Sequence, residues 1–281
     1  KTTSNAFGNT GEGVYIPYRA GIPLEDMEFV QFHPTGIYGM GVLLSEAARG
    51  EGGILRNGSG ERFMERYAPT IKDLAPRDMV SRAIRTEILE GRGIGGKDYV
   101  HLDLTHLGEQ KLAERLSDIT SFVKIYLGID PAKELIPIQP TCHYMMGGIP
   151  CNVDGHVLDG NQEVVPGLYA AGECSCLSLH GANRLGCNSL LDLVVFGRRT
   201  GLQIGRDLAG LPWQELPRNP EGATLERIRK IKERKTGEKV AHLRSRLQET
   251  MTLHCSVFRH EETLVQALSE IRSLEERYGE I

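Results

Sequence analysis

The chain has 281 residues, 40% of them apolar, which is enough for one large hydrophobic core or for two domains. Its net charge of −4 comes from interspersed acidic and basic residues, and this pattern argues against a nucleic-acid-binding protein. The longest apolar run, residues 190–196, is interrupted by Asp192 and falls well short of a bilayer span. The polar start, KTTSN, predicts no signal peptide and is typical of sequence inside a domain, so we expect the chain to begin within a larger protein.

The cysteine pattern predicts no metal site. None of the six cysteines forms a C-x-x-C pair. Cys174 and Cys176 would point to one face of a strand, but no further ligand lies near them, and a structural zinc usually needs four. We therefore expect reduced thiols in an intracellular setting.

The first half of the chain predicts a mixture of short elements. A Gly-rich turn at residues 8–13 leads into a short helical stretch that ends near Gly21. Residues 24–146 combine short strands and Gly-rich turns with one clear helix, residues 78–89. A strand covers residues 29–32, and Pro34 is expected to stop it and to hold His33 at its end.

A Gly-rich segment at residues 91–96 matches G-x-G-x-x-G and, with Lys97, nearly matches a P-loop. Both fingerprints require a strand before the glycines. Here the glycines follow a helix and precede an alternating strand at residues 98–102, and Asp98 stands where a P-loop needs Ser or Thr. The segment is predicted to be a plain loop.

The second half predicts strands, one long helix and then a charged helical region. Turn signals occur at residues 160–161 and 166–167. A helix follows, with Asn188 or Ser189 as its N-cap, and its free N–H groups together with Arg184 suit an anion. Residues 224–281 are charged and show partial helical periodicity.

Several long motifs stand in the order and approximate spacing of one known family. They are QFHPTG at 31–36, EAARGEGG at 46–53, RD at 77–78, HYMMGG at 143–148, GLYAAGE at 167–173 and HGANRLGCNSLL at 180–191. Together they resemble the flavoprotein subunit of succinate dehydrogenase and fumarate reductase, from about Ser4 to the C-terminal helices.

The resemblance implies an α/β and α+β fold: part of an FAD-binding Rossmann-like domain, an inserted substrate-capping domain and a helical segment. Residues 1–23 and 147–211 would belong to the FAD domain, 24–146 would form the capping domain, and 212–281 would start the helical domain. The family's N-terminal βαβ unit and its flavin-linking His are not among these residues. We therefore interpret the chain as an internal-to-C-terminal fragment and expect it, alone, to lack flavin and activity.

The chemistry that the resemblance implies is the interconversion of succinate and fumarate, with hydride passing to flavin N5 and a proton passing through Arg77. Glu46 and Arg49 would form its proton relay. A guanidinium is essentially never deprotonated at equilibrium, so Arg77 could act only in step with such a relay. Without the resemblance, a Glu–Arg pair spaced i, i+3 on a helix is more often a surface stabilising pair.

The resemblance assigns substrate binding to His33, Ser45, His143 and Arg184. A guanidinium fork matches a carboxylate with two hydrogen bonds, which a lysine would not do. Simpler roles remain open: His33 could be a core histidine, Ser45 a helix cap, His143 a hinge residue and Arg184 a salt-bridge partner. Ser45 stands where the family usually has Thr.

For FAD, the resemblance points to Glu12, Glu173, Ser189 and Leu190. Glu173 would accept hydrogen bonds from ribityl hydroxyls. The helix that starts at Ser189 would direct its positive end toward the flavin pyrimidine edge.

The family's partners are an iron–sulfur subunit, which takes the electrons, and membrane anchor subunits that are engaged indirectly. The resemblance thus implies a tricarboxylic-acid-cycle or electron-transport enzyme, peripheral on the cytoplasmic or matrix face of an energy-transducing membrane. Two alternatives stay open. L-aspartate oxidase shares several motifs, although residues 63–69, 145–146 and 191–197 look like the dehydrogenase. The isolated chain could also be a non-catalytic module without flavin.

Overall fold

A computed structural model describes residues 2–6, 8–213, 215–234 and 237–279. It divides into two compact units, Thr2–Leu211 and Pro212–Ile281. The predicted domain boundaries, after residues 23, 146 and 211, remain predictions.

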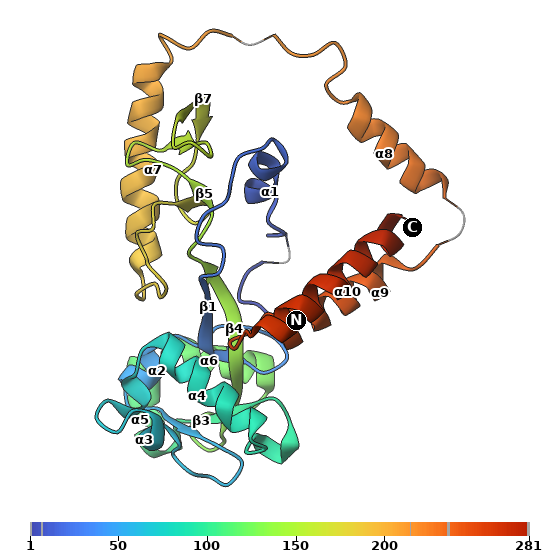
Figure 1. The fold of residues 1–281 in the computed structure, drawn as a ribbon. Coiled ribbons are helices and arrows are strands. Elements are labelled where there is room, and N and C mark those ends of the chain that lie inside the picture. Colours follow the sequence, from blue (N-terminus) through green and yellow to red (C-terminus); the bar gives the residue numbers. More distant parts are fainter. Residues whose placement is uncertain (1, 7, 214, 235–236, 280–281) are drawn as a thin grey trace. The chain divides into compact units, whose positions relative to one another are not determined.

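The first unit is built on a four-stranded antiparallel sheet (Figure 1). Its strand order is β1 (Val30–Ile37), β4 (Ile136–Met145), β3 (Val100–Asp103) and β2 (Ile54–Arg56). The helix α4 (Arg77–Leu89) packs on β1 and buries Val80, Ala83 and Ile84. The largest core cluster therefore lies under this sheet, which makes β1 and the start of α4 rigid supports.

Further helices complete this core. They are α2 (Ala47–Gly50), α3 (Met64–Tyr67), α5 (Gly108–Arg115) and α6 (Ser117–Leu127), with 3-10 turns η1 (Lys72–Leu74), η2 (Ile94–Gly96) and η3 (Thr105–Leu107). The prediction of one clear helix between residues 24 and 146 was wrong, since α5 and α6 also form. Many residues of α6 are β-branched or aromatic, with modest helix propensity, and the helix is stabilised by burying Ile119 and Val123 one turn apart. The Gly-rich segment 91–96 is a turn followed by η2, as expected for a loop.

The strand β1 does not stop at Pro34 as predicted but runs on to Ile37. Proline cannot donate to a strand ladder and is tolerated at sheet edges and bulges. β1 is an edge strand, and its register against β4 shifts between His33 and Gly36. The bulge accommodates Pro34, so His33 lies inside the strand rather than at its end.

The rest of the first unit carries smaller pairs of strands. α1 (Glu12–Arg19) is the short helix expected before Gly21. β5 (Ile149–Pro150) pairs in parallel with β8 (Ser175–Cys176), and β6 (His156–Leu158) pairs antiparallel with β7 (Val164–Tyr169). The predicted turn at 160–161 joins β6 and β7. Pro166 and Gly167, however, lie within β7, where a two-stranded pair leaves one strand edge open for a proline.

The long helix α7 (Asn188–Asp207) follows (Figure 1). Its N-cap is Cys187, with a left-handed φ of 62°, and not Asn188 or Ser189 as predicted. Because Cys187 adopts this left-handed conformation, it ends the preceding turn, and the helix begins at Asn188, earlier than side-chain capping preferences alone predict. Buried positions on α7 are Asp192 and Thr200, whereas many apolar side chains are exposed: Leu190, Leu191, Leu193, Val194, Val195 and Leu202.

The second unit is helical, as predicted. It contains α8 (Gly222–Glu233), α9 (Val240–His254) and α10 (Glu261–Gly279). α9 and α10 pack against each other, with Leu243, Ala267 and Leu274 buried. Across the described parts of the chain, no helix is both long and apolar enough to cross a membrane.

Candidate active site

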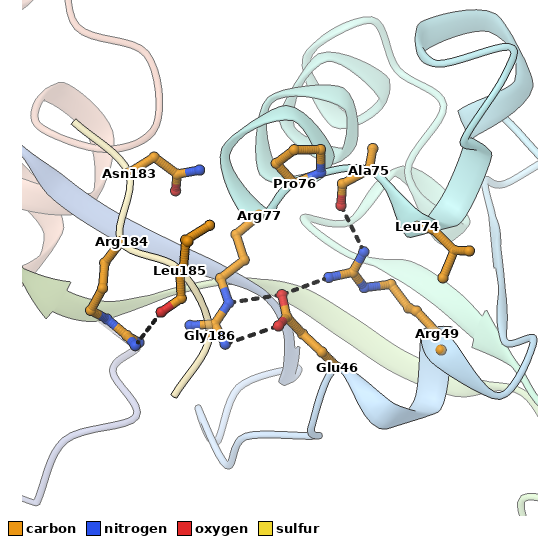
Figure 2. A pocket seen from close by; sticks show the side chains of 11 residues that line it. Glu46, Arg49, Leu74, Ala75, Pro76, Arg77, Asn183, Arg184, Leu185 and Gly186 are labelled. Atoms are coloured by element: carbon orange, nitrogen blue, oxygen red, sulfur yellow. Dashed lines mark hydrogen bonds and ion pairs between the residues drawn. The ribbon is translucent and has the colours of Figure 1, made fainter. Parts of the chain in front are cut away.

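Arg77 begins α4 and is held by Glu46. Its Nε donates to Glu46 Oε1 at 2.8 Å, and its Nη2 donates to Oε2 at 3.2 Å (Figure 2). A positive side chain at a helix N-terminus opposes the helix dipole. The two-point bond to a carboxylate offsets this cost and fixes the plane of the guanidinium, and Arg77 as a whole is only 9% exposed.

Glu46 also accepts a hydrogen bond from Arg49, which lies on α2. Arg49 Nη2 lies 3.1 Å from Glu46 Oε1, while Nη1 donates to the carbonyls of Asp73 and Ala75. Burial alone would raise the pKa of Glu46, but the hydrogen bond and charge of Arg77, with the charge of Arg49, lower it. Arg49, Glu46 and Arg77 thus form a continuous hydrogen-bonded series around an ionised carboxylate.

Arg184 lies in the segment between β8 and α7 and is buried. Its Nη2 is 3.0 Å from His143 Nε2, its Nη1 donates to the carbonyl of Leu185 at 3.0 Å, and its Cζ lies 4.5 Å from the Tyr144 ring centre. Burial, and then the charge of Arg77, lower the pKa of Arg184. Three contacts therefore hold this guanidinium, and none of them is with a carboxylate of the described residues.

His143 lies on β4, and its tautomer follows from its partners. A guanidinium only donates, so His143 Nε2 accepts from Arg184 and the ring proton is on Nδ1. Nδ1 then donates to Ser4 Oγ at 2.7 Å. Burial, together with the charges of Arg77 and Arg184, lowers the pKa of His143 to about 4. The imidazole is neutral at neutral pH.

His33 lies on β1 with no exposed surface. The N–H of Thr35 donates to its Nδ1 at 3.3 Å, so the ring proton is on Nε2. Within the described residues, that Nε2 has no partner, and the same is true of Arg184 Nε. A buried polar group without a partner costs about 1–3 kcal/mol. The ring centroids of His33 and His143 lie 5.2 Å apart in an edge-to-face contact, so the two imidazoles pack directly against each other.

A pocket of about 330 Å³ collects four of the predicted residues: Glu46, Arg49, Arg77 and Arg184 (Figure 2). Three guanidinium groups and one carboxylate leave two positive charges at this pocket. The remaining lining consists of residues 50, 74–76, 183, 185 and 186.

The other predicted substrate residues lie outside this lining. His143 contacts Arg184 directly, and His33 contacts His143. Ser45 is exposed, and its hydroxyl accepts a hydrogen bond from the N–H of Ala47 at 3.3 Å. Ser45 lies next to the site because it directly precedes Glu46 in the chain.

Sequence reasoning missed Gln31 and Asn183. Gln31 is 3% exposed, and its Oε1 accepts from Arg77 Nη1 at 3.1 Å, while Asn183 lines the pocket. A usable signal was present, because residues two apart on a strand share a face and Gln31 stands two positions before His33.

The predicted flavin residues divide into two groups. Glu12 and Glu173 line a second pocket of about 550 Å³, together with the aromatic and apolar side chains of Tyr15, Tyr18, Leu24, Met27 and Met145. Glu173 accepts from the N–H of Met145 at 3.1 Å, and burial raises its pKa. Ser189 and Leu190 lie in the first turn of α7 and do not line this pocket. Two carboxylate acceptors beside apolar walls fit a cofactor that combines hydroxyl groups with an aromatic ring.

Comparison with known families agrees with this geometry. Residues 1–190 match the FAD binding domain family, and residues 244–281 match the fumarate reductase flavoprotein C-terminal family. The chain belongs to the succinate dehydrogenase and fumarate reductase flavoprotein family. Membership confirms the expected family and the α/β and α+β fold with a helical segment, and it identifies FAD as the family's cofactor.

Individual relatives support the same assignment. The succinate dehydrogenase flavoprotein subunit of Coxiella burnetii is 50% identical over 284 residues, which cover 99% of this chain and 48% of the relative. The fumarate reductase flavoprotein subunit of Proteus vulgaris is 42% identical over 287 residues, 97% of this chain and 47% of the relative. A solved structure of E. coli quinol fumarate reductase is 40% identical with a TM-score of 0.87, covering all of this chain and 49% of its own. The chain thus spans about half the length of these relatives.

Proposed function

We propose that these residues form the dicarboxylate site of an enzyme that interconverts succinate and fumarate. The observation that carries the proposal is the pocket lined by Arg49, Arg77 and Arg184 together with one carboxylate, that of Glu46. Its excess of two positive charges matches a dianion with one carboxylate at each end. Burial strengthens this electrostatic complementarity.

Binding is assigned to Arg184, His143, His33 and, with its hydroxyl, Ser45. Arg184 offers a planar fork of donors, one of which, Nε, has no partner among the described residues. His33 Nε2–H is a second donor without a partner in this part of the chain; it is completely buried and lies beside His143. A substrate carboxylate would accept hydrogen bonds from both donors, whereas a purely structural role for these residues does not explain why the two donors lack an acceptor.

Proton transfer is assigned to Arg77, with Glu46 and Arg49 as its relay. When succinate is oxidised, Arg77 accepts a proton from a substrate carbon as it passes one of its own to the Glu46 carboxylate. Glu46 then passes this proton to Arg49 as Arg49 releases one of its own to solvent in the pocket that it lines, so both guanidinium groups stay cationic. The lowered pKa of Glu46 keeps it ionised and able to accept. The bonds of 2.8 and 3.1 Å from Arg77 and Arg49 to the same oxygen make the path continuous.

FAD, when bound, supplies the hydride acceptor at its N5 atom. Glu12 and Glu173 would accept hydrogen bonds from its hydroxyl groups, and Ser189 and Leu190 would approach it from the first turn of α7. We further propose that electrons leave to an iron–sulfur subunit, and that the protein is held peripherally, through anchor subunits, on the cytoplasmic or matrix face of a membrane. The relatives named quinol fumarate reductase and mitochondrial succinate dehydrogenase [ubiquinone] support this assembly.

The test is succinate oxidation by the full-length, flavin-loaded protein with an artificial electron acceptor, inhibited competitively by malonate. L-aspartate serves as the comparison substrate. Turnover with succinate and none with L-aspartate is the expected result. Oxidation of L-aspartate alone, or the absence of malonate inhibition, would overturn the proposal.

A further inference from the structure

Asn183 joins the segment that carries Arg184 to two other elements. Its Oδ1 accepts a hydrogen bond from Gln31 Nε2 at 2.9 Å, on β1. Its Nδ2 donates to Asp78 Oδ1 at 3.0 Å, in the first turn of α4. The donor and acceptor sides of this amide are therefore both in use.

Gln31 closes these contacts into a ring. Its Oε1 accepts from Arg77 Nη1, and its Nε2 also donates to the backbone carbonyl of Arg184 at 2.6 Å. The path runs from the Arg77 side chain through Gln31 and Asn183 to Asp78, which follows Arg77 along the chain. Each amide has one correct orientation in this ring, because reversing either would place donor against donor or acceptor against acceptor.

The ring links parts that are buried to different degrees. α4 is anchored in the core by Val80 and Ile84, which have no exposed surface. The segment with Arg184 is more open, since Leu185 is 72% exposed. Asn183 thus ties the more exposed segment directly to the anchored helix through Asp78, beside the indirect link that Gln31 makes between the Arg184 carbonyl and Arg77.

We propose that Asn183 is a positioning residue that sets the place of Arg77 relative to Arg184. This inference rests on the proposed function, in which Arg77 moves the proton and Arg184 binds a carboxylate. A displacement of about 1 Å between such groups can cost about a hundredfold in rate. Arg184 keeps its own contacts with His143, Leu185 and Tyr144, so Asn183 acts on turnover more than on binding.

The experiment exchanges the two partners in the full-length, flavin-loaded protein. Asn183→Asp sets a carboxylate against Asp78 and removes the donor, whereas Asp78→Asn leaves an acceptor oxygen for Asn183. The double variant Asn183→Asp/Asp78→Asn reverses the direction of this hydrogen bond, because the amide at position 78 now donates to the carboxylate at position 183. The amide oxygen at position 78 remains available to Arg82, the other partner of Asp78. Asn161→Asp, in the exposed turn between β6 and β7, adds the same charge as a matched control.

We expect Asn183→Asp to lower kcat about tenfold or more, while the malonate inhibition constant rises no more than about threefold. The double variant should return kcat to within about threefold of wild type, and Asp78→Asn and Asn161→Asp should stay in that range. Wild-type kcat in folded Asn183→Asp, or no recovery in a folded double variant, would overturn the inference alone. A lower melting temperature with unchanged kcat per bound flavin would likewise show a merely structural role. Wild-type protein inactive with succinate would overturn the proposed function, and this inference with it.

Discussion

Arg184 Nη2 and His143 Nε2 lie 3.0 Å apart, although the two residues are 41 positions apart in the chain. The contact makes His143 an acceptor and leaves its single proton on Nδ1, toward Ser4. Arg184 and His143 therefore form one unit: a carboxylate that takes the Nη2 donor also releases His143 Nε2, which can then carry the ring proton and donate to the carboxylate while Nδ1 accepts from the Ser4 hydroxyl. This coupling leads to the first prediction.

His143→Ala and Arg184→Ala should each weaken malonate binding without unfolding the protein. Each variant removes a polar or charged contact near a desolvated carboxylate, worth about 1.5–3 kcal/mol, or roughly ten- to hundredfold in affinity. Malonate titrations beside melting curves measure both effects, and Arg115→Ala, on the exposed side of α5, is the control. Unchanged malonate affinity in both folded variants would contradict the assignment of this pocket.

Arg77→Lys should nearly abolish turnover and leave malonate binding measurable. Lysine offers a shorter point charge that cannot reproduce the two-point bond to Glu46, so the proton donor is misplaced by about an ångström and the rate falls about a hundredfold or more. Steady-state kinetics with malonate inhibition separates the two quantities. Wild-type turnover in this variant would mean that Arg77 only binds substrate.

Glu46→Gln should lower kcat about a hundredfold, because an amide keeps the shape of the side chain but cannot relay a proton. Malonate should bind at least as tightly, since the pocket then carries one more net positive charge. Kinetics with succinate and malonate across pH 6–9 tests both statements. A variant with normal kcat would rule out the Arg49–Glu46–Arg77 relay.

The stability of the protein should fall between pH 6.5 and about 4, in part because of His143. Its folded-state pKa is about 4, below the unfolded value of about 6.5, so within this window the unfolded state binds more protons and acidification favours unfolding. His143→Gln removes this contribution. Melting temperatures at pH 7, 6 and 5 should decline less steeply in the variant. An equal slope in both proteins would show that His143 does not titrate abnormally.

Glu87→Ala should destabilise the first unit by about 3 kcal/mol, because it leaves the buried Asn57 amide and the half-buried Tyr67 and Arg92 without their carboxylate. Glu87 has no exposed surface and accepts hydrogen bonds from Asn57, Arg66, Tyr67 and Arg92. Burial alone would raise its pKa, but these bonds lower it to about 2. Urea unfolding measures the effect, with the exposed Glu109→Ala as control. A change below about 0.5 kcal/mol would show that the network is not stabilising.

The sequence by itself determined what depends on local signals. Turn and capping residues placed the helix before Gly21, the loop at 91–96, the helix starting near Arg77 and the helical C-terminal region, within a residue or two of the structure. The motifs also identified the family and its cofactor before any contact was known. These features follow from side-chain periodicity and backbone preference over a few residues, which a single sequence displays directly.

Only the tertiary structure decided which side chains meet. The pairing of β1 with β4 brings His33 beside His143, and the bulge at Pro34 keeps His33 inside the strand, where the local proline signal had predicted the strand's end. The ring through Gln31 and Asn183 joins residues 152 positions apart. Such contacts depend on strand register and on the folding of distant segments against one core. No local pattern contains that information, because the free energy that selects it comes from packing the whole unit.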